Sequence, residues 1–268
     1  LKTNRGILMK IGVTQIILGN MSVDNTIGLC QTAGYQAVEL TFRDGKDIHV
    51  DLNNDKIRAV ADKFHEADIE ITSITALKGS LLSSDSSERV EAAKSVERAL
   101  EVAGILGTGA ILVHPGQLSV QGTYQQAWDN LVGTLKDLAP VAERCKVAIG
   151  LENVWNKFLL SPKEMREIVD EVNNDWIGVY LDTANMMAYG YPEHWIRELG
   201  DRIKRVHLKD FSRGEHRFVN LLDGDTDWPT VMSELRSVGY TNSIIHEVGG
   251  DREAQIDLAE RMRKIVSM

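Results

Sequence analysis

Cysteine and proline are scarce in this sequence, which excludes several kinds of fold. The 268 residues include two cysteines and five prolines. So few cysteines rule out a small scaffold held by disulfides, and so few prolines rule out a proline-rich linker or fibrous chain. Cys30 and Cys145 have no metal-binding or redox spacing, so we expect buried free thiols in a reducing compartment.

Long apolar runs and an excess of positive charge are also missing. No stretch approaches the roughly 20 apolar residues of a membrane span. Residues 1–8 lack the apolar segment and cleavage site of a secretory signal, so we expect a cytoplasmic protein with no membrane partner. The formal net charge of -9 argues against a nucleic acid partner, although it does not exclude a local basic pocket.

Short β-branched runs alternate eight times with longer segments of helical periodicity. Several runs are apolar on both faces, as strands covered by helices should be. The expected strands are residues 10–14, 37–41, 70–75, 110–114, 147–151, 177–181, 203–207 and 243–246. The expected helices are residues 23–34, 53–67, 86–106, 124–144, 161–172, 192–199, 228–238 and 251–266.

This alternation, without a linker, predicts a single α/β domain over residues 9–268. A closed (β/α)8 TIM barrel fits best, because its usual size is about 250 residues. A doubly wound open sheet is the rival, but no Gly-rich phosphate turn of that type follows the first strand. Because Met9 directly precedes the first strand, we expect residues 1–8 to be an N-terminal extension outside the fold.

Residues with metal-binding side chains end four successive predicted strands, the fifth to the eighth. They are Glu152, Asp182, His207 and Glu247. In a TIM barrel such positions line the active-site mouth. Each residue alone has an ordinary explanation, such as a helix cap, but the repetition favours one shared cation. Three oxygen donors and an imidazole suit Mn²⁺ or Mg²⁺, with Co²⁺ and Zn²⁺ as alternatives.

A cation there would polarise a substrate carbonyl and stabilise the oxyanion formed when the neighbouring carbon loses its proton. Glu152 and Glu247 come from strands five and eight, so they are well separated around the ring. They are therefore the predicted catalytic pair, delivering and removing protons on opposite faces of that carbon.

Five stretches carry a family resemblance: Leu151-Glu-Asn153, Leu181-Asp-Thr-Ala-Asn185, Val206-His-Leu-Lys-Asp210, residues 222–228 and Ile245-His-Glu247. From Met9 to its C-terminus, the chain resembles the sugar isomerase/epimerase family with a xylose isomerase-like TIM barrel. The resemblance implies that the four strand-end residues hold one metal. It also implies that the two glutamates exchange the C3 proton of a sugar or sugar phosphate through an enediolate. Relatives are often dimers or tetramers, so a homo-oligomer is compatible with it.

The resemblance assigns two further positions to substrate contact, and His114 is a third candidate for the substrate site. Asn185 matches a substrate-contacting histidine of ketose epimerases, and the replacement prevents transfer of the sugar preference. Arg213 matches an arginine that contacts substrate. His114 ends the fourth strand where the related endonuclease IV has a metal ligand, and a hydrogen-bonded supporting role is its alternative. The extra histidines of that endonuclease are missing, which favours one metal and disfavours DNA cleavage.

Aromatic and basic residues after the later strands complete the predicted substrate site. Trp155 and Trp195 follow strands five and six and could wall a sugar ring. Lys209, Arg213 and Arg217 could add positive charge near Gly249-Gly250-Asp251, where the start of the last helix could hold a phosphate. Asp251 would repel an anion, so free and phosphorylated sugars both stay open.

The resulting prediction is a metal-dependent ketose or ketose-phosphate 3-epimerase. An aldose–ketose isomerase and an inosose-type dehydratase need the same metal and remain alternatives. A non-catalytic sugar-binding barrel is less favoured, because such a barrel should have lost at least one ligand or proton-transfer residue.

Overall fold

Eight parallel strands close into a barrel in a computed structural model that describes residues 9–76 and 78–268. The order around the barrel is β1-β10-β7-β6-β5-β4-β3-β2. This confirms the predicted TIM barrel, whereas the predicted extension at residues 1–8 lies outside the described residues. The strands are β1 (Ile11–Thr14), β2 (Ala37–Phe42), β3 (Glu70–Ala76), β4 (Ala110–Val113), β5 (Ala148–Glu152), β6 (Ile177–Asp182), β7 (Ile203–Leu208) and β10 (Ile244–His246).

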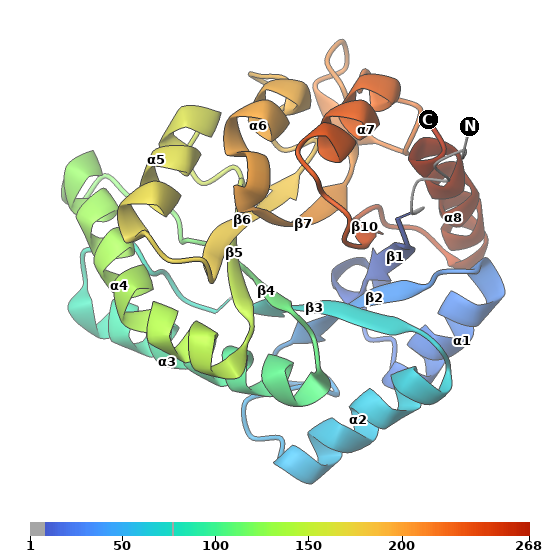
Figure 1. Ribbon diagram of the computed structural model, residues 1–268, viewed down its shortest axis with the longest axis horizontal. Coiled ribbons are helices and arrows are strands. Elements are labelled where there is room, and N and C mark those ends of the chain that lie inside the picture. The colour runs from blue at the N-terminus through green and yellow to red at the C-terminus, as the bar shows by residue number, and fades with distance from the viewer. Residues whose placement is uncertain (1–8, 77) are drawn as a thin grey trace, which may run out of the picture.

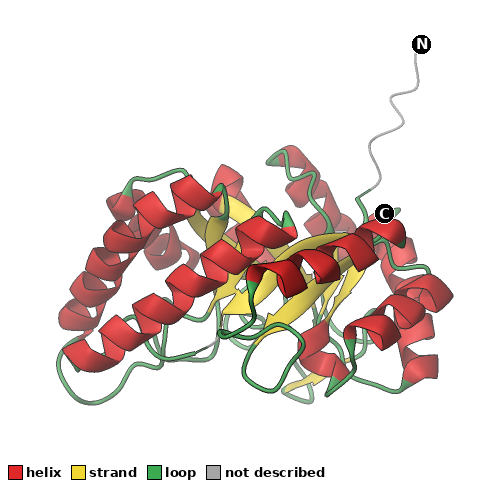
Figure 2. Ribbon diagram, turned by 90° about the horizontal axis from the view of Figure 1, so that it is seen from below, coloured by secondary structure: helices red, strands yellow, loops and turns green. Residues whose placement is uncertain are grey.

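Helices surround the strands on all sides of the barrel (Figures 1 and 2). Their bounds, like those of the barrel strands, differ from the predicted ones by at most one residue. They are α1 (Val23–Ala33), α2 (Asn54–Glu66), α3 (Ser86–Leu106), α4 (Tyr124–Cys145), α5 (Pro162–Val172), α6 (Pro192–Leu199), α7 (Trp228–Ser237) and α8 (Arg252–Val266).

Capping residues explain why the ends of these helices could be predicted from the sequence. At the start of α5, Ser161 accepts a hydrogen bond from the Glu164 amide while the Glu164 side chain accepts from the Ser161 amide. Pro162 occupies the first turn, where its missing N–H costs nothing. Gly34 and Gly107 end α1 and α3 in the left-handed conformation that glycine adopts without strain.

A short antiparallel hairpin and one half-exposed thiol depart from the sequence predictions. The hairpin joins β8 (Asp210–Ser212) to β9 (Arg217–Val219) after β7. Cys30 is a buried free thiol as expected, but Cys145 is only partly buried, so that part of the prediction is wrong. Within the described part of the chain, no helix combines the length and apolarity needed to cross a bilayer.

Candidate metal and substrate site

The four predicted metal ligands lie together at the carboxyl ends of the barrel strands. Glu152 and Asp182 are the last residues of β5 and β6, and Glu247 directly follows β10. His207 in β7 pairs in register with Asp182. One potential ligand atom from each residue lies within 4.8 Å of those of the other three. The strand ends therefore bring three carboxylates and one imidazole to one point.

Three atoms of this cluster are buried and have no hydrogen-bond partner among the described residues: Asp182 Oδ2, His207 Nδ1 and Glu247 Oε2. Buried polar atoms are nearly always hydrogen-bonded, and leaving one unsatisfied costs about 1–3 kcal/mol. Hard oxygen donors with one imidazole are a donor set that divalent cations accept. The residues present therefore fit a metal ion.

Lys209, predicted to bind substrate, reaches into the same cluster. Its Nζ lies 3.2 Å from Asp182 Oδ2 and 3.0 Å from Glu247 Oε2, in ion pairs that lack hydrogen-bond geometry. Burial opposes its charge, but the surrounding carboxylates outweigh burial and raise the pKa of Lys209 above its ordinary value. The ammonium thus offsets part of the negative charge of the cluster.

Hydrogen bonds from two asparagine residues and from backbone amides fix the positions of Glu152 and Asp182. Asn153 accepts a hydrogen bond from the Asp182 amide (2.8 Å) and donates to its carbonyl (2.9 Å). Asp182 Oδ1 accepts from the amides of Ala184 and Asn185, which leaves Oδ2 facing the cluster. Asn185 Nδ2 donates to Glu152 Oε1 (3.4 Å) and to the Asn153 carbonyl (2.9 Å). Asn185, predicted to contact substrate, therefore touches a candidate ligand directly.

Glu39 in β2 is a buried partner of His207 that sequence reasoning missed. Its Oε1 lies 3.0 Å from His207 Nε2 and accepts from Thr14 Oγ1 at 2.7 Å. Its Oε2 accepts from Ser73 Oγ at 2.8 Å. With Nε2–H donating to this carboxylate, Nδ1 is the ring nitrogen left for a metal, as in many carboxylate–histidine–metal sites. The signal was a lone charged residue inside the apolar run Ala37-Val-Glu-Leu-Thr41.

The two candidate catalytic glutamates differ in their electrostatic surroundings. Burial, together with repulsion from Glu247 and Asp182, raises the pKa of Glu152 to about 8. Burial also acts to raise the pKa of Glu247, but His207 and Lys209 outweigh it and lower that pKa to about 2. Environments that separate the pKa values of two carboxyl groups in this way are typical of acid/base pairs.

Hydrogen bonds to the backbone occupy two other predicted substrate residues. His114 Nδ1 accepts from the Gly116 amide at 3.0 Å, and burial lowers the pKa of its ring. Arg213 donates to the carbonyls of Met187 and Gly190, both at 2.7 Å, and lies 4.4 Å from the centre of the Tyr191 ring. Arg213 therefore clamps the segment after β6.

An aromatic wall stands beside the cluster. Trp155 is 49% exposed, stacks on Phe218 with ring centroids 5.1 Å apart, and donates to the Asn185 carbonyl at 2.6 Å. Lys209 Nζ lies 5.0 Å from the Phe218 ring centroid, which ties the wall to the cluster. Trp195 is buried in the core, so its predicted position as a second wall is wrong.

Asp210, also missed from the sequence, anchors the segment that follows the hairpin. Its carboxylate is fully buried and accepts from the amides of Leu222 (3.0 Å) and Gly224 (3.2 Å). It also accepts from Thr226 Oγ1 (2.7 Å) and Trp228 Nε1 (3.1 Å). One carboxylate thus fixes residues 222–228 and, through them, the base of the hairpin.

The sequence profile of the xylose isomerase-like TIM barrel family matches residues 27–265. Over 167 residues the chain is 26% identical to an uncharacterised protein of Methanocaldococcus jannaschii (59% of this chain, 57% of that one). Over 147 residues it is 27% identical to D-psicose 3-epimerase of Enterocloster bolteae (53% and 47%). Over 226 residues it is 21% identical to L-ribulose-5-phosphate 3-epimerase UlaE of Salmonella paratyphi C (82% and 80%). The chain thus spans about half the length of the first two of these relatives.

Solved structures share the same fold. A D-tagatose 3-epimerase-like protein superposes with a TM-score of 0.82 at 20% identity, over 97% of both chains. The IolI protein with a bound zinc atom superposes with a TM-score of 0.82 at 21% identity, over 97% of this chain and 98% of that one.

Proposed function

The chain belongs to the xylose isomerase-like TIM barrel family, and from this premise we propose that it is a divalent-metal-dependent sugar epimerase. The most specific form of the proposal is 3-epimerisation of a ketose or ketose phosphate. Relatives named D-psicose 3-epimerase and L-ribulose-5-phosphate 3-epimerase support it.

The observation that carries the proposal is a set of buried ligand atoms that face one another and make no hydrogen bond within the described structure. Lys209 Nζ is an ion-pair neighbour of two of them. Asp182 Oδ2, His207 Nδ1 and Glu247 Oε2 lie with a Glu152 oxygen inside a span of 4.8 Å. We propose that these residues hold one cation, with Mn²⁺ or Mg²⁺ preferred because oxygen donors predominate. The zinc atom in the IolI structure supports testing Zn²⁺ as well.

The chain's own residues account for the proton chemistry. When bound, the cation would polarise the ketose carbonyl and make the hydrogen on the neighbouring carbon more acidic. Glu152 and Glu247 belong to strand ends that have β6 and β7 between them, so their carboxylates approach a substrate from different sides. One removes the C3 proton and the other returns a proton to the opposite face. Trp155 offers the substrate an apolar wall.

Hydrogen–deuterium exchange tests this function directly. The protein, loaded with Mn²⁺, is incubated in D₂O with a panel of free and phosphorylated ketoses, and NMR locates the deuterium. Deuterium at C3 together with the epimeric product is the expected result. Exchange at C1 would reassign the protein as an aldose–ketose isomerase, and loss of water as a dehydratase. If no sugar exchanged deuterium with any metal, a non-catalytic sugar-binding barrel would be the remaining interpretation.

Substitution of the two glutamates tests their roles. Glu152→Gln and Glu247→Gln should each give a folded protein that has lost nearly all C3 exchange, because the amide cannot accept a proton. Glu97→Gln, an exposed position on α3, is the matched control and should keep full activity. Full activity in either site variant would overturn the proton-transfer assignment.

A further inference from the structure

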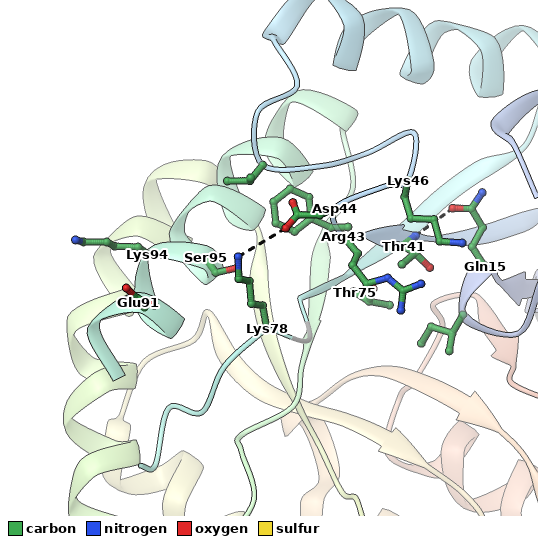
Figure 3. A pocket seen from close by; sticks show the side chains of 13 residues that line it. Gln15, Thr41, Arg43, Asp44, Lys46, Thr75, Lys78, Glu91, Lys94 and Ser95 are labelled. Atoms are coloured by element: carbon green, nitrogen blue, oxygen red, sulfur yellow. Dashed lines mark hydrogen bonds and ion pairs between the residues drawn. The ribbon is translucent and has the colours of Figure 1, made fainter. Parts of the chain in front are cut away.

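A cavity of about 630 Å³ opens at the carboxyl ends of β1, β2 and β3, beside α3 (Figure 3). Its volume falls in the range of about 300–1,000 Å³ that is usual for small-molecule sites. Gln15 follows β1, Thr41 and Thr75 belong to β2 and β3, and Ser95 lies on α3. The four candidate metal ligands do not line it, so the proposed metal centre leaves this space unexplained.

The floor of the cavity lies one layer above the carboxylate that holds His207. Glu39 on β2 is the register partner of Ser73 on β3, and Thr41 is the register partner of Thr75. Alternate residues of a strand share a face, so the two threonines stand above the Glu39–Ser73 pair. With a rise of about 3.3 Å per residue, they are about 7 Å nearer the rim.

The cavity is basic although the chain as a whole is acidic. Four cationic and two acidic side chains line it, against a net charge of -9 for the chain. The Arg43 guanidinium lies beside Thr75, whereas Lys94 points away from the cavity floor (Figure 3). The Lys46 ammonium turns towards Gln15 and donates to the Gly19 carbonyl and to Asn20 Oδ1, so it brings positive charge to the cavity with part of its donors already used. The Arg43 guanidinium has no hydrogen-bond or ion-pair partner among the described residues. Its five donors are therefore available to a ligand.

Unpartnered hydroxyls provide a second, independent sign of a polar ligand. Thr41 Oγ1 and Thr75 Oγ1 are buried and make no hydrogen bond within the described structure. Both residues line the cavity, and they are 5% and 0% exposed. The Gln15 side chain accepts a hydrogen bond from the Thr41 amide and donates one to Thr26 Oγ1. These bonds hold the floor of the cavity in place.

We propose that this cavity binds the phosphoryl group of the substrate, so that the substrate is a ketose phosphate. The inference rests on the proposed epimerase function and names its substrate class. A phosphoryl group carries a charge of about -1.5 to -2 at neutral pH and offers three acceptor oxygens. Arg43 is suited to bind two of them in a fork, and Lys46 adds a point charge. An uncharged sugar terminus would leave both cations without a counter-charge.

Two of the basic residues expected to hold a phosphate near the start of α8, Arg213 and Arg217, already have partners within the protein. Arg213 binds the Met187 and Gly190 carbonyls, and Arg217 pairs with Glu215. The Asp251 carboxylate caps the start of α8 by accepting from the Ala254 amide. Neither arginine is therefore as free of partners as the Arg43 guanidinium.

Substrate discrimination is the first test. The measured quantity is the ratio of kcat/KM for a ketose phosphate to that for the same ketose without phosphate, with the Mn²⁺-loaded enzyme. Arg43→Gln should lower this ratio about tenfold or more, since it removes a charge-assisted contact. Arg43→Lys should lower it less, and Lys136→Gln, at an exposed lysine of α4 that does not line the cavity, should leave it unchanged. An unchanged ratio in Arg43→Gln, or a preference for a carboxylate-bearing ketose over the phosphate, would overturn the proposal.

Binding of inorganic phosphate separates failure of the subsite from failure of the proposed function. Phosphate is titrated into the Mg²⁺-loaded protein, and calorimetry or ³¹P NMR reports binding. Binding that is weakened in Arg43→Gln and kept in Lys136→Gln supports the subsite even when no sugar is turned over. Equal binding by both variants refutes it, even when epimerase activity is confirmed.

Discussion

Replacing Glu39 by glutamine is the perturbation that best tests how the centre is built. Glu39 is fully buried, and its charge faces His207 from the side opposite the candidate metal position. Burial acts to raise the pKa of Glu39, but the charge and hydrogen bond of His207 and the hydroxyl of Thr14 outweigh it and lower that pKa. The carboxylate is therefore ionised at neutral pH, and glutamine removes its charge at nearly constant shape.

The expected magnitude follows from the contacts that glutamine can keep. The amide oxygen can still accept from His207 and Thr14, while the amide nitrogen must face Ser73 Oγ, which can accept instead of donate. We therefore expect a loss of only about 1–3 kcal/mol in unfolding free energy. Losing the negative partner makes the imidazole a poorer ligand, and such changes typically weaken metal binding by about 10–100-fold. Glu39→Ala should lower the unfolding free energy more, by about 3–5 kcal/mol, because it leaves the buried His207 without its charged partner.

Metal titration of the metal-free protein by calorimetry measures the change in Kd, and thermal unfolding followed by circular dichroism measures stability. Glu70→Gln is the matched control. It changes the same residue type on β3 at the opposite end of the barrel, where Glu70 pairs with Lys10 and Ser243. A folded Glu39→Gln protein with the metal Kd of the unchanged protein would refute the idea that Glu39 supports the ligand.

Three further predictions follow from single positions. Gly12→Ala should destabilise the barrel by about 1–3 kcal/mol or more, because its Cβ would lie 2.3 Å from the Ala37 carbonyl oxygen. Gly28→Ala in α1 places its Cβ where no neighbouring atom lies within 4 Å, so it should stabilise the protein slightly. Thermal unfolding compares the two variants. Asp210→Asn should cost about 1–3 kcal/mol and speed proteolysis within residues 222–228, because an amide cannot accept from all the donors that converge there. Metal binding should weaken as pH falls and should release protons. The carboxylates around His207 outweigh burial and raise the pKa of its ring, and Nδ1 must lose its proton before it can coordinate a metal. Calorimetry in buffers of different protonation enthalpy measures the number of protons released.

Local pattern was enough to predict the barrel and the cluster of acidic residues and histidine. Each barrel strand is an apolar run bounded by a helix signal, and Glu152 and Asp182 terminate such runs in chain order. Parallel strands in register place equivalent ends at one rim. For this reason the convergence of the four residues needed no knowledge of distant contacts.

Partners joined only by the closed barrel could not be predicted in this way. Glu39 and His207 are 168 residues apart, and β2 and β7 are not neighbours in the sheet. The hairpin was missed because its strands, Asp210–Ser212 and Arg217–Val219, are three residues each, too short for a periodic pattern. The sequence also cannot show that the Arg213 guanidinium donates to backbone carbonyls, whereas the Arg43 guanidinium has no partner among the described residues.

The arrangement divides the barrel mouth into two halves with different roles. The ends of β5, β6, β7 and β10 supply the candidate ligands. On the other half, Glu39 of β2 contacts His207, and Thr14 of β1 and Ser73 of β3 donate hydrogen bonds to Glu39. The same three strands end in the basic cavity. Because Glu39 and Thr41 share one face of β2, a displacement of that strand moves the support of the histidine and the floor of the cavity together. Binding of an anion in the cavity should therefore restrain β2 in the position that orients His207, which couples recognition of the substrate's distal end to the geometry of the proton-transfer site.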